Sequence, residues 1–151
     1  MNKVWKFGYF ILKISYYFYI IGLSKILEKI KIKGVCITLA NLNQLKLFRN
    51  IHMRGIGGTS MSGIAEMLKH WGFHVTGSDD NSSELTDKLI ARGIPVTIGY
   101  DFNNLSKASL VVYTAAIKPD DPELLKAKEL NIPTVERADF LGEITKAFAD
   151  T

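Results

Sequence analysis

The segment from Gly55 to Ser62 combines three glycines with three hydroxyl side chains within eight positions. These residues are Gly55, Gly57, Gly58, Thr59, Ser60 and Ser62. Glycines allow positive φ angles and let backbone N–H groups approach a ligand without obstruction by Cβ atoms. A helix that begins directly after such a loop directs its free N–H groups and its positive dipole end at the same place. The pattern favours binding of a diphosphate; the competing interpretation is a tight strand–helix turn without a ligand.

Asp79 follows Gly57 by 22 residues and lies at the end of the next expected strand. In a Rossmann unit, an acid at this place binds ribose hydroxyls. The alternative role of Asp79 is to cap the following helix. The dinucleotide fingerprint requires a third glycine at position 60, where this chain has Ser60. A nucleoside diphosphate therefore fits the loop better than NAD does.

The elements that must position these residues are short apolar runs that alternate with helical patterns. This alternation predicts an α/β fold: a Rossmann-like, doubly wound, mainly parallel sheet of about five strands. The expected strands are residues 51–54, 73–77, 95–98, 109–114 and 133–135. The expected helices are residues 61–71, a helix capped by residues 81–83 that ends near residue 92, residues 121–131 and residues 137–148.

Charge divides the 151 residues into two segments, which we take as a leader (1–50) and a domain (51–151). The net charge of the whole chain is +4. The leader holds nine Lys/Arg and one acid, whereas the domain holds ten Lys/Arg and fourteen acids. The basic character thus belongs to the leader, and total charge gives no argument for a nucleic-acid partner. The single cysteine excludes a disulfide framework.

The leader is hydrophobic, aromatic and basic. Residues 4–23 form a run long enough to cross a bilayer as a helix, but Lys6 and Lys13 interrupt it. Three interpretations remain open: a membrane anchor with a basic flank, a misassigned or non-essential extension, and a folded accessory element.

Longer strings resemble the Mur ligase family, in the order that the family has them. Residues 51–66, which contain the glycine loop, resemble the opening of members that join L-alanine to UDP-N-acetylmuramic acid. Residues 75–79, 112–117 and 131–138 resemble the second-strand motif, the end of the fourth strand and the approach to the domain boundary. The resemblance covers residues 51–148 and implies a first domain that holds the UDP part of this peptidoglycan precursor, in a cytoplasmic ligase.

The resemblance also implies roles for individual residues. The loop that holds the diphosphate would comprise Gly55, Gly57, Gly58, Thr59, Ser60, Met61 and Ser62. Asp79 would face the uridine ribose, and Thr114, Ala115 and Ala116 would border the nucleotide. No catalytic residue and no metal ligand is expected in the chain itself.

The ATP site of the family is a glycine-rich P-loop that ends in Gly-Lys-Thr, and this chain contains no Gly-Lys-Ser/Thr sequence. ATP and Mg²⁺ are therefore expected only for the full-length ligase, and the chain alone is not expected to run the ligation. We expect a truncated ligase or an isolated first domain, whose partners are UDP-N-acetylmuramic acid and the missing central and C-terminal domains. Alternatives are an NAD(P)-binding oxidoreductase domain and a non-catalytic, membrane-tethered nucleotide-binding remnant that contacts the membrane through residues 4–23.

Two residues depart from the family pattern. Arg54 stands where an apolar strand end is usual, and a buried charge there is costly unless it is paired. Tyr100 stands where His is frequent, so a uracil-edge contact from this position is in doubt. Other polar residues are expected to be unremarkable: the three histidines on the surface or at sheet edges, Glu66 in solvent, and residues 120–121 as a helix cap.

Overall fold

The computed structural model describes residues 47–149, with side chains described as far as residue 146. The predictions for the leader, including a membrane span at residues 4–23, lie outside the described residues. Within the described part, no helix has both the length and the apolar character needed to cross a membrane.

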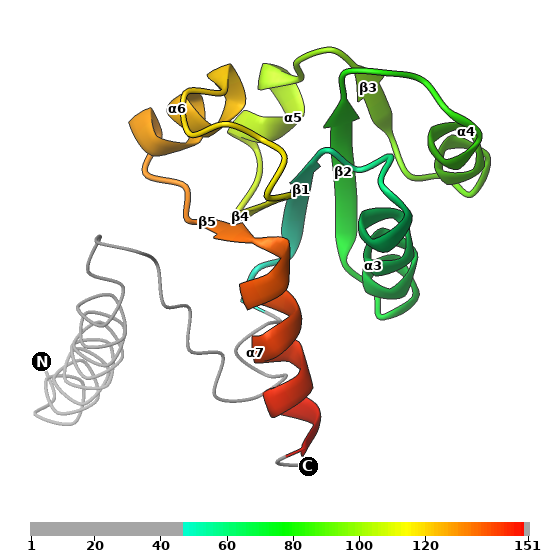
Figure 1. Ribbon diagram of the computed structural model, residues 1–151. Coiled ribbons are helices and arrows are strands. Elements are labelled where there is room, and N and C mark those ends of the chain that lie inside the picture. Colours follow the sequence, from blue (N-terminus) through cyan, green and yellow to red (C-terminus); the bar gives the residue numbers. More distant parts are fainter. Residues whose placement is uncertain (1–46, 150–151) are drawn as a thin grey trace, which may run out of the picture. The chain divides into compact units, whose positions relative to one another are not determined.

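The described residues form a parallel sheet of five strands (Figure 1). The strands are β1 (Asn50–Arg54), β2 (His74–Asp79), β3 (Val96–Ile98), β4 (Leu110–Tyr113) and β5 (Thr134–Glu136). Their order is β3-β2-β1-β4-β5, and every neighbouring pair is parallel. The order reverses direction between β1 and β4, so the topological switch point lies between these two strands. The predicted Rossmann-like sheet is confirmed, with strand boundaries that differ by one or two residues.

Five helices connect and cover the strands. They are α3 (Thr59–His70), α4 (Glu84–Ala91), α5 (Phe102–Ser106), α6 (Pro122–Glu129) and α7 (Arg137–Ala149). Figure 1 shows α3 and α4 on one side of the sheet and α5 and α6 on the other, and each pair is in contact. Helix α7 packs against β4 and β5.

The caps explain where these helices begin. Ser83 caps α4 and forms a capping box with Thr86, as the polar run at 81–83 predicted. Asp121 caps α6, and Pro122 occupies the first turn, where its missing N–H costs nothing. Helix α5 was not predicted; it is five residues long and begins at Asp101, whose carboxylate accepts the Asn104 N–H.

The apolar core lies on both faces of the sheet, as is usual where helices cover a parallel sheet on both sides. Ile51 and Met53 of β1 are fully buried. On α3 the buried apolar residues are Met61, Ile64, Ala65 and Leu68. A second cluster is formed by Leu105, Val111 and Ala127, with Ala108, Leu124 and Ile132 packed against it. Burial of apolar surface on both faces stabilises the sheet, and the carboxyl-terminal ends of its parallel strands lie along the same side.

Candidate functional site

The glycine loop follows β1 at the switch point, on the edge of the sheet where ligands bind in open α/β folds (Figure 1). Gly55 has a φ of +80°, a conformation that side-chain-bearing residues rarely adopt. A Cβ atom added at Gly57 would lie 2.9 Å from Asp79 Oδ2 and 3.0 Å from Thr86 Cγ2. Both positions therefore require glycine, one for its backbone angle and the other for space.

The amides of residues 55–58 all donate to acceptors within the protein. Those of Gly55 and Ile56 donate to Ser78 O, at 2.8 and 3.2 Å, and that of Gly58 donates to Gly55 O at 3.4 Å. The Gly57 amide donates to Asp79 Oδ2 at 2.8 Å. The glycine amides are thus occupied within the protein.

Thr59, Ser60 and Met61, at the start of α3, show no acceptor for their amides among the described residues. The N-cap of α3 is Gly58, which offers no side chain to accept these bonds. The first turn of a helix without such acceptors attracts anions through its N–H groups and its dipole. The amides available to an anion are therefore those of residues 59–61, which follow the glycines that the sequence pattern singled out for this role.

The side chains of the loop point to different environments. Thr59 and Ser60 are exposed, so their hydroxyls are accessible beside the free amides. Ser62 is buried and donates its hydroxyl to Thr59 O at 2.9 Å. The Met61 side chain is buried in the core, so only its backbone faces the loop.

Asp79 lies beside the glycine loop and holds it in place. One carboxylate oxygen accepts the Gly57 amide, and the other accepts the Asn81 amide at 3.1 Å. The suggested role of Asp79 as a helix cap is wrong, because Ser83 caps α4. Each carboxylate oxygen can accept more than one hydrogen bond, so these two contacts leave acceptor capacity on Asp79.

The segment after β4 forms the other side of the switch point. A Cβ atom added at Gly55 would lie 3.1 Å from Thr114 Cγ2, so Thr114 adjoins the glycine loop. Ala115 and Ala116 are exposed in the turn that follows. The structure thus brings Thr114 to the loop and leaves the two alanines at the surface.

A buried polar network, which the sequence did not predict, lies between the sheet and α6. Glu123 of α6 is completely buried, and its Oε2 accepts the Ser78 hydroxyl at 2.7 Å and lies 3.2 Å from His52 Nε2. Its Oε1 accepts the Asp101 amide. The other ring nitrogen of His52 lies 2.8 Å from Thr76 Oγ1. The expectation that His52 lies on the surface or at a sheet edge is wrong, because His52 is buried on the central strand β1. His70 and His74 are exposed, as expected.

The hydrogen bonds of this network keep its carboxyl groups ionised. Burial by itself raises the pKa of Glu123, but the bonds from His52, the Asp101 amide and Ser78 outweigh it and hold the pKa below its usual value. Burial also works against the ionised form of Asp101. Bonds from Asn104 and Thr97 nevertheless hold the pKa of Asp101 below its usual value.

Arg54 is 1% exposed and turns toward the same face of the sheet as His52. Its Nε and one terminal nitrogen donate to Asp121 Oδ2 at 3.1 and 3.0 Å, and that terminal nitrogen also donates to Asp80 Oδ1 at 2.6 Å. Burial by itself lowers the pKa of Arg54, but the bonds and charges of Asp80, Asp121 and Glu123 raise it above the usual value. The buried charge is therefore paired, so the cost expected of a lone buried charge does not apply here.

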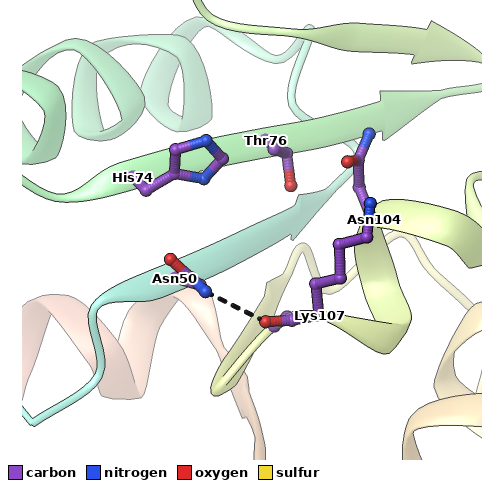
Figure 2. A pocket seen from close by; sticks show the side chains of 6 residues that line it. Asn50, His74, Thr76, Asn104 and Lys107 are labelled. Carbon is purple, nitrogen blue, oxygen red and sulfur yellow. Dashed lines mark hydrogen bonds between the residues drawn. The ribbon is translucent and has the colours of Figure 1, made fainter.

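A hollow at the amino-terminal ends of the strands, away from the glycine loop, involves none of the predicted site residues. Figure 2 shows that it lies beside α5, near the amino-terminal ends of β1 and β2, lined by Asn50, His74, Thr76, Asn104, Lys107 and Ala108. Its volume is about 160 Å³, whereas pockets for ligands of drug size span about 300–1,000 Å³. This hollow is too small for a nucleotide sugar. Within the described part, no three His, Cys, Asp or Glu side chains are grouped so as to hold a metal ion.

Comparison with known proteins identifies the family. Residues 50–149 match the family described as "Mur ligase family, catalytic domain". The chain belongs to the Mur ligase family. The resemblance seen in the sequence is confirmed, and the match includes the glycine loop, Asp79 and the segment after β4.

Two similar proteins from different organisms have the same name. The chain is 54% identical over 101 residues to UDP-N-acetylmuramate–L-alanine ligase of Acetivibrio thermocellus, an alignment that covers 67% of this chain and 22% of the relative. It is 51% identical over 100 residues to the ligase of the same name from Clostridium botulinum, covering 66% and 22%. The chain thus spans about a fifth of the length of these curated relatives.

Solved structures of the family have the same fold. UDP-N-acetylmuramate-alanine ligase of Thermotoga maritima matches with a TM-score of 0.59 and 33% identity, over 61% of this chain and 21% of that one. A UDP-N-acetylmuramate:L-alanyl-gamma-D-glutamyl-meso-diaminopimelate ligase from Neisseria meningitides matches with a TM-score of 0.56 and 32% identity, over 64% and 31%.

Proposed function

We propose that this chain binds UDP-N-acetylmuramic acid through its UDP part, as the substrate-binding portion of a UDP-N-acetylmuramate–L-alanine ligase in peptidoglycan biosynthesis. The observation that carries the proposal is the set of three amides, of Thr59, Ser60 and Met61, at the switch point of the sheet, for which the described part of the chain supplies no acceptor. Membership of the Mur ligase family and the names of the relatives support the choice of ligand.

The proposed contacts follow the available groups. The diphosphate accepts the free amides at the start of α3 and the exposed hydroxyls of Thr59 and Ser60. The occupied glycine amides shape the loop instead of contacting phosphate directly. Asp79 accepts a ribose hydroxyl with its remaining lone pairs. Thr114 and the turn at 115–116 border the nucleotide from the β4 side.

The chemistry of ligation is proposed for the longer enzyme. ATP and Mg²⁺ would be held by a central domain and the amino acid by a C-terminal domain, in a cytoplasmic enzyme. The residues proposed here would position the substrate and carry no step of phosphoryl transfer. We also propose that binding resides in residues 51–151 and does not require the leader. Support for this boundary comes from β1 and the family match, which both begin at Asn50, one residue before it.

Isothermal titration calorimetry of the full chain with UDP-N-acetylmuramic acid and with NAD tests the proposal. We expect saturable binding of the UDP-sugar only. Gly57→Ala should weaken this binding at least tenfold, because its Cβ would displace the Asp79 carboxylate or Thr86. Gly63→Ala, in α3, is the matched control, since a Cβ there meets nothing within 4 Å. Saturable binding of NAD without binding of the UDP-sugar would refute the proposal.

A further inference from the structure

One side chain, that of Arg54, connects three segments at the carboxyl edge of the sheet. Its guanidinium donates to Asp80 after β2, to Gly99 O after β3 at 3.4 Å and to Asp121 before α6. The guanidinium carbon also lies 4.9 Å from the centroid of the Tyr100 ring, within cation–π distance. These segments are far apart in the sequence, and Arg54 is bonded to all of them.

Stability alone does not account for an arginine at this position. Replacing a buried ion pair by apolar residues of similar volume is often neutral or stabilising, because the pair must repay its desolvation. The guanidinium does supply directional bonds, which fix the orientation of planar partners more strictly than an apolar side chain can. The contacts of Arg54 therefore indicate a role in orienting the edge of the sheet.

The bonds made by Arg54 extend to Asp79. The Gly99 carbonyl accepts from Arg54, while the Gly99 amide donates to Asp79 O at 2.7 Å. Asp80, the next residue, is itself bonded to Arg54 although it is 62% exposed. The Asp79 carbonyl group and the residue that follows it are thus held by contacts that begin at Arg54.

In a Rossmann unit the diphosphate lies at the first helix, and the acid after β2 meets the ribose, so the nucleoside extends across β2 toward β3. We propose that Arg54 is a positioning residue for the nucleoside half of the ligand. It holds Asp79, Asp80 and the segment Gly99–Tyr100 in the arrangement that receives ribose and base. This inference rests on the proposed nucleotide site. Among the described residues, Arg54 makes no hydrogen bond to the amides at the start of α3, which we assign to the diphosphate.

Titration of the full chain with UDP and with inorganic pyrophosphate tests this division. We expect Arg54→Met to weaken UDP binding about tenfold and to leave pyrophosphate binding within twofold of the unaltered chain. Asp80→Asn should act in the same direction, and because Asp80 is largely exposed this variant folds even if Arg54→Met does not. Arg92→Met is the matched control, because Arg92 is 60% exposed and pairs with Glu66 on the surface.

The outcomes separate this inference from the proposed function. If UDP binds the unaltered chain and neither Arg54→Met nor Asp80→Asn changes its affinity, the inference is wrong and the proposed function stands. An equal loss of UDP and pyrophosphate affinity would also overturn it, because the role of Arg54 would then be general support of the fold. Failure of the unaltered chain to bind UDP would refute the proposed function and this inference together.

Discussion

Replacement of Glu123 by glutamine examines the buried network directly, because glutamine keeps the shape of the side chain and creates no cavity. The carboxylate accepts bonds on both oxygens: from His52 and Ser78 on Oε2, and from the Asp101 amide on Oε1. The amide oxygen of glutamine can replace only one of these oxygens. In the best orientation it keeps the His52 and Ser78 bonds, and its NH₂ group then faces the Asp101 N–H.

The expected cost follows from these contacts. Loss of one bond to an ionised acceptor costs about 1.5–3 kcal/mol. The two bonds that remain become bonds to a neutral acceptor, which is roughly half as strong, at a cost of about 0.5–1 kcal/mol each. We therefore expect Glu123→Gln to lower the free energy of unfolding by about 2.5–5 kcal/mol, similar to breaking a buried ion pair. That is a large part of the roughly 5–15 kcal/mol that stabilises a typical domain.

Urea denaturation at neutral pH measures this change, and a fall in Tm of more than about 10 °C should accompany it. Glu129→Gln is the control in the same helix, because Glu129 is exposed and pairs only with Lys126 on the surface. We expect the control to remain within about 0.5 kcal/mol of the unaltered chain. A Glu123→Gln variant within 1 kcal/mol of the unaltered chain would refute the assignment of this network as a major source of stability.

Three further outcomes follow from the same structure. The pKa values of Glu123 and Asp101 are lower in the folded state than in the unfolded chain. The stability that these two groups provide is therefore complete above their unfolded pKa values of about 4 and is lost as the pH falls through the lower folded pKa values. Urea midpoints measured between pH 7 and pH 2.5 should show this decline, and a flat profile would contradict it. Gly77→Ala should lower the free energy of unfolding by about 1–3 kcal/mol in urea denaturation, because its Cβ would lie 2.8 Å from Met53 O; an unchanged value would mean that the strand yields freely. Ser83→Ala should cost about 1 kcal/mol through loss of the α4 cap, measured as a Tm shift, and no shift would show that the capping box is dispensable.

Much of the fold was predictable from local signals. Strands and most helices were found from alternating apolar runs and from caps such as Ser83 and Asp121, because these signals act within a few residues. Helix α5 was missed because a five-residue helix shows no apolar periodicity. Its signal was the Asp101–Asn104 spacing, in which an N-cap side chain accepts the amide three residues later.

The polar network was not predictable in the same way. His52 and Arg54 alternate with apolar Ile51 and Met53, a pattern usual for a strand with one face in solvent. In a parallel sheet covered on both sides, that second face is buried, and its polar residues need partners. The partner of His52 is Glu123, which is 71 residues away, so no local pattern links the two. Likewise, two of the glycine amides are occupied by Ser78 O and Asp79 Oδ2, which lie more than 20 residues away in the sequence, so the local loop pattern does not predict these bonds.

The polar network also favours a single register between β1 and β2. His52 stands opposite Thr76, and Arg54 opposite Ser78. A slip of one residue would turn Thr76 and Ser78 to the other face of the sheet, because successive side chains in a strand alternate between faces. His52 and Glu123 would then be buried with bonds missing, at a cost that purely apolar strands would not incur. The network thus discriminates against misaligned pairing, so that the glycine loop and Asp79 meet in a single alignment.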